Sequence, residues 1–241
     1  MLVQLQKLSS IPRILSTFAE DSDNPGELAF MVIEDPSSNR SLSKADTYQN
    51  WDLYERIRFA SQALDELDKI HSHRITSLNS TSAPILHRNL SPDAIRASSH
   101  DGQPIFTRFH LASIDPNKSV VSGSGISLDD EAREYAAPEV LKYGLSVADT
   151  HSDVYSLARI LERLFINYSD EALAHRALSI LGMGYRANPK ERNTAREMAV
   201  RLDELLLPGP VNARDEDQFL LDPDLWDETT QIHLPGKSNQ N

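Results

Sequence analysis

The sequence offers few side chains for covalent or metal chemistry. Cysteine is absent, which excludes disulfides, thiolate metal sites and a cysteine nucleophile. Of the eight histidines, His71 and His73 form the one close pair. At positions i and i+2 of a predicted helix end, two side chains do not share a face. We therefore expect both to be solvated surface histidines, and we predict no metal site.

One segment in the middle of the chain has a more specific pattern. Residues 86–95, LHRNLSPDAI, resemble the catalytic loop of protein kinases, in which His-Arg-Asp-Leu is followed by a Pro and an Asn. Further segments resemble other motifs of that family, in the family's order: FHLA (109–112) at the place of the Asp-Phe-Gly segment, YAAPEV (135–140) with Pro138 and Glu139, SDVYSLARIL (152–161), and NPKERNTAREM (188–198) with Arg192.

Because these motifs occur in order and at compatible spacing, the chain resembles the protein kinase-like superfamily, with the Ser/Thr kinases as its nearest type, over roughly residues 5 to 207. The resemblance implies a mainly α, α+β fold: a kinase-like C-terminal lobe with a partial hairpin of the small lobe. It assigns residues 1–35 to a small-lobe remnant, 36–207 to the helical lobe and 208–241 to a flexible tail or linker. The sequence of the loop is also similar to that of kinase-like regions in large bacterial multidomain proteins.

The departures from the family pattern bear on activity. Kinases hold magnesium with carboxylate and amide groups, orient the acceptor hydroxyl with an Asp and steady the phosphates with a Lys. By the resemblance, none of these groups is present at the matching positions of this chain. Asn89 replaces the catalytic Asp and Ser91 replaces the Lys. Ala94 replaces the metal-binding Asn, and Arg108 replaces the metal-binding Asp. The resemblance therefore implies a catalytically inactive domain, a pseudokinase, with no expected cofactor.

The small lobe is incomplete by the same comparison. No Gly-x-Gly-x-x-Gly pattern occurs, and the only Lys before the adenine-facing hinge is Lys7, in a segment that matches a helix. No Glu precedes Glu20, so the Lys-Glu ion pair of active kinases is missing as well. The hinge itself would be Ile33, Glu34 and Asp35, should nucleotide bind at all.

The scaffold residues of the family are present. The resemblance implies that Asp153 accepts backbone N–H bonds from His87 and Arg88, and that Glu139 pairs with buried Arg192. It also implies that His87 and Phe109 belong to the hydrophobic column that links the two lobes.

Local patterns indicate the elements that must position these residues. Residues 14–18 and 27–33 are strand candidates around the turn formers of DSDNPG, and a polar linker is expected over 34–50. A second hairpin is expected between residues 85 and 107, with Asp101-Gly102 in its turn. A loop rich in Ser and Gly follows at 116–127.

Three helices are predicted. Apolar residues at steps of three and four indicate an amphipathic helix over 51–71, and a more broadly apolar pattern predicts a central, buried helix over 151–165. Thr150 with Asp153, and Thr194 with Glu197, resemble helix-start pairs. The last helix is expected to end at Leu207, before Pro208-Gly209-Pro210.

Charge and hydropathy restrict the partners. The chain carries 24 basic and 36 acidic residues, a net charge of −12, which disfavours nucleic acid and anionic membrane surfaces. No apolar run reaches the length of a membrane helix, and no signal peptide is recognisable, so a cytoplasmic protein is expected. The expected partner is another protein or a further domain of a larger protein.

Three hypotheses follow. The first is a non-catalytic regulatory or protein-binding module. The second is an atypical ATP-binding Ser/Thr kinase domain that is active only with a small lobe supplied elsewhere, in which Arg108 binds ATP phosphates without metal. The third is a helical interaction domain without a nucleotide cleft. A thermal-shift titration with ATP, with and without Mg²⁺, distinguishes them.

Overall fold

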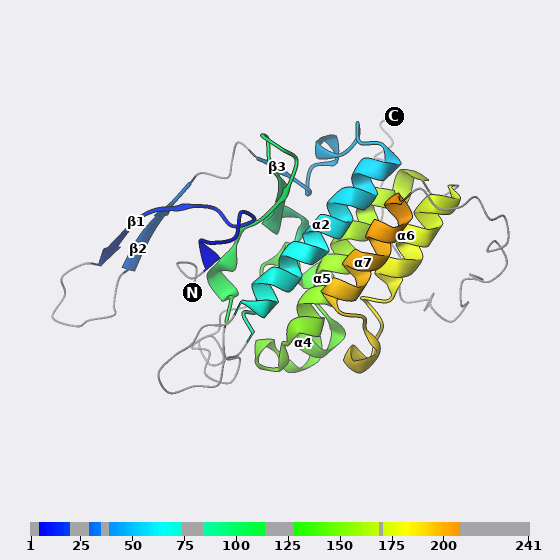
Figure 1. Cartoon of the computed structure of the whole chain (residues 1–241). Helices are drawn as coiled ribbons and strands as arrows, with labels where there is room; N and C mark the ends of the chain where they lie inside the picture. Colours follow the sequence, from blue (N-terminus) through cyan, green and yellow to red (C-terminus); the bar gives the residue numbers. More distant parts are fainter. Residues whose placement is uncertain are drawn as a thin grey trace, which may run out of the picture. The chain divides into compact units, whose positions relative to one another are not determined.

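The structure is a computed structural model that describes residues 5–19, 29–34, 39–73, 84–113, 128–168 and 171–207. All of these residues belong to one unit, Met1–Pro208. Over this part of the chain the fold is a mainly helical α+β arrangement, with six α-helices and a small three-stranded antiparallel sheet (Figure 1). The predicted loop over 116–127 and the predicted tail over 208–241 lie outside the described residues.

The predicted first hairpin is present. Strand β1 (Ile14–Ala19) pairs antiparallel with β2 (Ala29–Ile33), and its register shifts between Ile14 and Ser16. The backbone N–H of Glu34 donates to the carbonyl of Arg13 at 2.7 Å, which extends the pairing by one step. The turn that DSDNPG was expected to form lies outside the described residues.

The segment expected to be a polar linker is instead part of the fold. Strand β3 (Arg40–Ser41) joins β4 (Ile95–Ala97) and β5 (Pro104–Phe106) in a sheet of order β3-β4-β5, and the 3₁₀ helix η2 (Ala45–Thr47) follows it. Leu42 is buried, and the Thr47 hydroxyl donates to the Ser41 carbonyl at 2.6 Å. The prediction missed this strand because a two-residue element has no readable period.

The second predicted hairpin is confirmed by the pairing of β4 with β5. Its turn contains Gly102 at φ 71°, a left-handed conformation that glycine adopts without steric cost. The Gly102 N–H donates to the Ser98 carbonyl at 3.0 Å, which closes the turn.

The four long helices of the described residues are α2 (Leu53–Ser72), α5 (Thr150–Glu162), α6 (Ala172–Gly182) and α7 (Ala195–Leu206). Three of them begin at a capping box and α6 does not. Asp52 and Thr194 each form a reciprocal capping box with the Glu three residues later, at Glu55 and Glu197. The Thr194–Glu197 prediction is therefore confirmed, and α7 ends one residue before Leu207.

One predicted helix start was wrong. Helix α5 is capped by Asp149, whose carboxylate accepts the Ser152 N–H at 3.0 Å, and not by Thr150 with Asp153. Both pairs have the spacing of a capping box, so spacing alone does not separate them. The Asp153 side chain is buried and makes contacts elsewhere in the fold.

The helices pack around one hydrophobic core. Helix α2 contacts α5, α6 and α7, and Figure 1 shows α2, α5 and α7 side by side. The predicted stripe of α2 is fully inside, with Leu53, Ile57, Ala60, Leu64 and Leu67 at most 5% exposed. The predicted central helix also has buried residues on several sides, and it continues after Glu162 as a 3₁₀ helix, η8 (Arg163–Tyr168).

Two short helices complete this part of the chain: α3 (Asp130–Tyr135) and α4 (Pro138–Tyr143), with Pro138 at the first position of α4. Ala132 of α3, Val140 of α4 and Ala137 between the two helices are buried, and they line one small cavity together with Ala148 and Ser152 at the start of α5. They therefore bring the Glu139 region next to the buried end of α5.

The core is tightly packed at Gly184. A Cβ added there would lie 2.8 Å from the Met198 side chain and 2.9 Å from the Ala158 Cβ. We expect Gly184→Ala to lower the free energy of unfolding by about 1–3 kcal/mol, because the α5 backbone must shift to make room. Gly182→Ala is the matched control, since its nearest contact is the Tyr185 hydroxyl at 3.7 Å. Urea denaturation measures both, and equal midpoints would contradict the packing argument.

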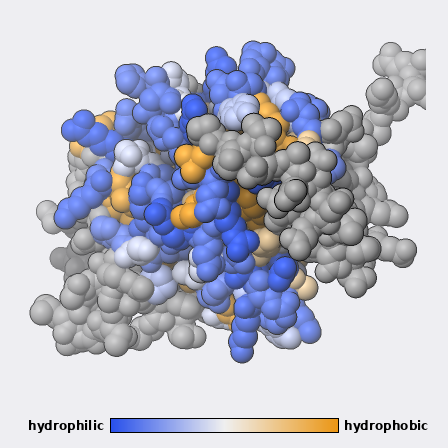
Figure 2. All heavy atoms as spheres, turned by 45° about the vertical axis from the view of Figure 1, so that its right-hand side comes forward, coloured by the Kyte–Doolittle hydropathy of each residue, from blue (hydrophilic) through white to orange (hydrophobic). Residues whose placement is uncertain are grey.

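None of the described helices combines the length and apolar character needed to cross a membrane. The molecular face in Figure 2 is mostly hydrophilic, and its apolar side chains occur in separate spots.

Candidate functional site

The loop that resembles a kinase catalytic loop is held by one buried carboxylate. Asp153, near the start of α5, accepts the backbone N–H of His87 at 2.7 Å and of Arg88 at 2.8 Å. The contacts that the resemblance implied for Asp153 are thus formed. Burial by itself would raise the pKa of Asp153, but the hydrogen bond and charge of His71, with the other donors, hold that pKa below its usual value.

His71 corrects one of our expectations. Its side chain is buried, and its Nε2 lies 3.0 Å from the Asp153 carboxylate, 82 residues along the chain. The expectation of a solvated surface histidine was therefore wrong for this residue. The spacing of His71 and His73 excluded a pair on one helix face. It gave no information on the tertiary contacts of either ring.

His87 lies fully buried against aromatic rings. Its ring centroid is 4.5 Å from that of Phe109, and its Nε2 lies 2.8 Å from the Thr107 carbonyl. The Asn89 N–H donates to its Nδ1 at 3.3 Å. Both ring nitrogens are therefore satisfied in the neutral form, and burial lowers the pKa of His87 to about 4.

The second expected scaffold contact is also formed. Arg192 donates from Nη1 and Nη2 to the two carboxylate oxygens of Glu139, at 2.7 and 2.8 Å. The same guanidinium donates to backbone carbonyls of Arg186, Ala187 and His151, and it lies 4.8 Å from the Tyr155 ring centroid. Burial would raise the pKa of Glu139, but its hydrogen bonds to Arg192 and Ser152 leave that pKa lowered. The Arg192 side chain is 0% exposed, so this pair joins α4 firmly to the segment before α7.

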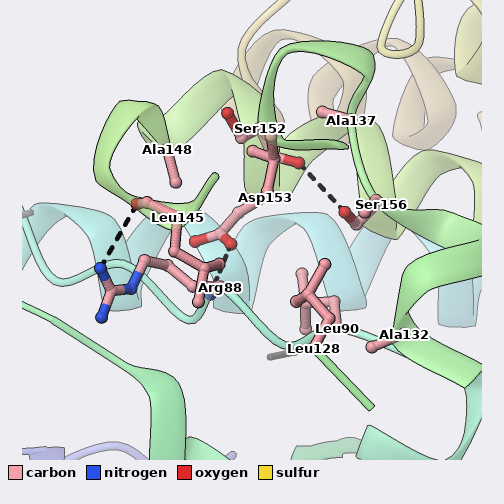
Figure 3. A pocket seen from close by; sticks show the side chains of 12 residues that line it. Arg88, Leu90, Leu128, Ala132, Ala137, Leu145, Ala148, Ser152, Asp153 and Ser156 are labelled. Atoms are coloured by element: carbon pink, nitrogen blue, oxygen red, sulfur yellow. Dashed lines mark hydrogen bonds between the residues drawn. The ribbon is translucent and has the colours of Figure 1, made fainter. Parts of the chain in front are cut away.

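Arg88 has a strained backbone. Its φ is 62°, a conformation that costs a non-glycine residue roughly 1–2 kcal/mol. Its side chain donates to the Leu111 carbonyl at 2.7 Å. It also donates to the Leu145 carbonyl at 3.4 Å, while Asp153 accepts its backbone N–H (Figure 3). The adjoining cavity, between Leu90, Leu128 and α5, has a volume of about 10 Å³, enough for about one water molecule.

The centre of the site is the guanidinium of Arg108. It pairs with the carboxylates of Asp93 and Asp129, the latter at 3.2 Å. Arg108 is the other described non-glycine residue with a positive φ, 61°, besides Arg88. Burial would raise the pKa of Asp93, but hydrogen bonding from Ser41 and the charges of Arg108 and Arg96 keep that pKa low. A partly exposed cation thus lies between two carboxylates.

The other degenerate positions lie in the same part of the fold. Asn89 is buried, and its Nδ2 donates to Asp129 at 3.1 Å. Ser91 and Ala94 are also buried, and the Ala94 carbonyl accepts the Thr107 N–H at 2.9 Å. The structure therefore brings Asn89, Ser91, Ala94 and Arg108 into one region. As a set they supply an amide, a hydroxyl, a methyl and a guanidinium.

The predicted hinge is described only in part. Ile33 is the last residue of β2 and Glu34 is exposed, whereas Asp35 lies outside the described residues.

A scan against models of protein families finds no match for this chain, and neither does a comparison with curated proteins. Within the described ranges, no three or more His, Asp or Glu side chains gather in a way that could hold a metal ion.

Sequence analysis did not identify Asp93 and Asp129 as site residues. Asp93 lies 15 residues before Arg108 and Asp129 lies 21 residues after it. No local period links such positions. Residue chemistry gave no signal either, because an Arg that is 39% exposed does not require a carboxylate partner.

Proposed function

We propose that this chain is a catalytically inactive protein kinase-like domain, a pseudokinase, that acts as a regulatory or protein-binding module. The observation that carries the proposal is the ion-paired Arg108 at the position where the resemblance places a metal-binding Asp. In this arrangement the guanidinium already occupies oxygens of Asp93 and Asp129.

Electrostatics support the absence of phosphoryl transfer. A magnesium ion needs several oxygen ligands in near-octahedral geometry. At the positions of the family's metal ligands, Ala94 has no side-chain oxygen and Arg108 has a positive charge. A divalent ion near Arg108 would have to displace a cation that is covalently part of the chain.

The position of the catalytic base leads to the same conclusion. The Asn89 amide donates to Asp129 and cannot take a proton from a hydroxyl, so the step that an Asp performs in kinases has no counterpart here. Loss of a positioned general base typically lowers a rate by roughly 10² to 10⁴.

The scaffold contacts favour a retained, folded module over a decayed one. Asp153 holds the loop at His87 and Arg88, and Glu139 pairs with Arg192, although neither contact involves the degenerate positions. A domain with a well-made scaffold and altered reactive groups can still present a surface to another protein. Its expected partner is a protein or a further domain, and we place it in the cytoplasm.

The alternative is an ATP-binding kinase domain completed by a small lobe from elsewhere. In that function Arg108 would bind nucleotide phosphates. The structure gives one argument against it, because both terminal nitrogens of Arg108 are engaged by carboxylates.

A thermal-shift titration with ATP tests the proposal. We expect no change in melting temperature with up to millimolar ATP, with or without Mg²⁺, because ligands that bind the folded state raise its stability by mass action. A metal-independent increase that Arg108→Ala abolishes would favour the alternative. A magnesium-dependent increase accompanied by transfer of labelled γ-phosphate would overturn the proposal.

A further inference from the structure

A second cavity, of about 450 Å³, lies beside the site but apart from Arg108. Its walls come from β3, from η2 with the turn after it, from the 3₁₀ helix η3 (Pro92–Ala94) and from β4. All ten side chains that line it are polar or charged. Its volume is in the range that small-molecule ligands occupy.

Some charged side chains of this cavity have partners among the described residues and others do not. Asp93 is already paired with Arg108, and Ser41 donates to it at 2.9 Å. Arg40 and Lys44 also line the cavity, and both are exposed. Within the described part of the chain, neither of these two side chains makes a hydrogen bond or ion pair. The chain as a whole has a net charge of −12, so two exposed cations at one cavity, with no direct partner among the described residues, are a distinct local feature.

We propose that this cavity binds the phosphoryl group of a small molecule, with Arg40 and Lys44 as its main ligands. A phosphate monoester carries about −1.5 to −2 charges at neutral pH, which matches two cations better than a single carboxylate does. The Arg fork engages two phosphate oxygens and the Lys ammonium engages one as a point charge. This inference concerns residues outside the kinase-like motifs and goes beyond the proposed function.

Asp46 provides a test that separates phosphate binding from a general disturbance of the fold. Its exposed carboxylate also lines the cavity and repels a phosphoryl group bound by Arg40 and Lys44. Removing that charge should therefore tighten binding, whereas a change that merely disturbs the fold would weaken it. The amides of Gln49 and Asn50 remain for the uncharged part of the ligand.

Calorimetric titration of the full chain with pyrophosphate, at low salt and without metal, tests the site. We expect Arg40→Glu with Lys44→Glu to weaken binding by at least about tenfold, and Asp46→Asn to tighten it severalfold. The matched control is Arg58→Glu with Arg176→Glu, two exposed cations on α2 and α6 whose reversal changes the net charge equally. This control should bind pyrophosphate like the natural chain, and melting curves verify that every variant folds.

Several results would overturn the proposed phosphate site. Absence of binding to the natural chain, or equal weakening in both double variants, would overturn the site, because the second result reports only the average field of the protein. Loss of binding in Arg108→Ala but not in the Arg40/Lys44 variant would move the phosphate to the kinase-like site and also overturn it. Much tighter binding of a phosphoserine peptide than of pyrophosphate would overturn the small-molecule assignment.

Discussion

Replacing Arg192 by alanine should lower the free energy of unfolding by about 3–5 kcal/mol, because it leaves the Glu139 carboxylate without its buried partner. The same substitution frees three backbone carbonyls that Arg192 now satisfies. For a domain of this size the melting temperature should fall by on the order of 10 °C. Thermal denaturation followed by circular dichroism measures it.

Arg108→Ala is the control for that prediction. Arg108 also pairs with carboxylates, but its side chain is 39% exposed. Exposed ion pairs contribute less than about 1 kcal/mol, so the melting temperature should change little. Arg192→Lys should lie between the two, because it retains the charge and loses the two-pronged geometry. Equal melting temperatures for the two alanine variants would show that burial does not determine how much each ion pair contributes to stability.

The second large effect is a loss of stability in mild acid caused by His87. Its folded pKa of about 4 lies below the ordinary value of 6.5, because burial disfavours the charged ring. Between these two values the unfolded chain binds the additional proton, so stability falls as the pH falls. The contribution is complete above pH 6.5 and lost by about pH 4, and the pKa difference corresponds to about 3 kcal/mol.

Urea denaturation at pH 7, 5.5 and 4 measures this contribution, with His87→Phe as the comparison. The phenylalanine ring can still pack against Phe109, and it has no proton to gain. We expect the variant to be less stable at pH 7, because Thr107 loses a donor, but to lose about 3 kcal/mol less than the natural chain on acidification. Parallel stability curves for the two proteins would contradict the assignment. Asp153 is present in both proteins, so the stability that it loses as the pH falls toward and below 3.8 cancels in this comparison.

The local patterns of the sequence were sufficient for much of the secondary structure. Helix α2, helix α7 with its Thr194 cap and the turn at Gly102 were predicted, because each depends on residues within about four positions of one another. Two predictions of local structure were wrong. Strand β3 is too short to show a period, and two overlapping cap signals at the start of α5 have the same spacing.

The candidate site depended on the fold to a much greater extent. The sequence by itself determined which reactive groups are present: an amide at 89, a methyl at 94 and a guanidinium at 108. Only the tertiary structure decided that this guanidinium pairs with Asp93 and Asp129, and that His71 is buried against Asp153. These contacts join residues that are 15 to 82 positions apart, and such pairs form only where chain folding, rather than any local preference, brings their backbones together.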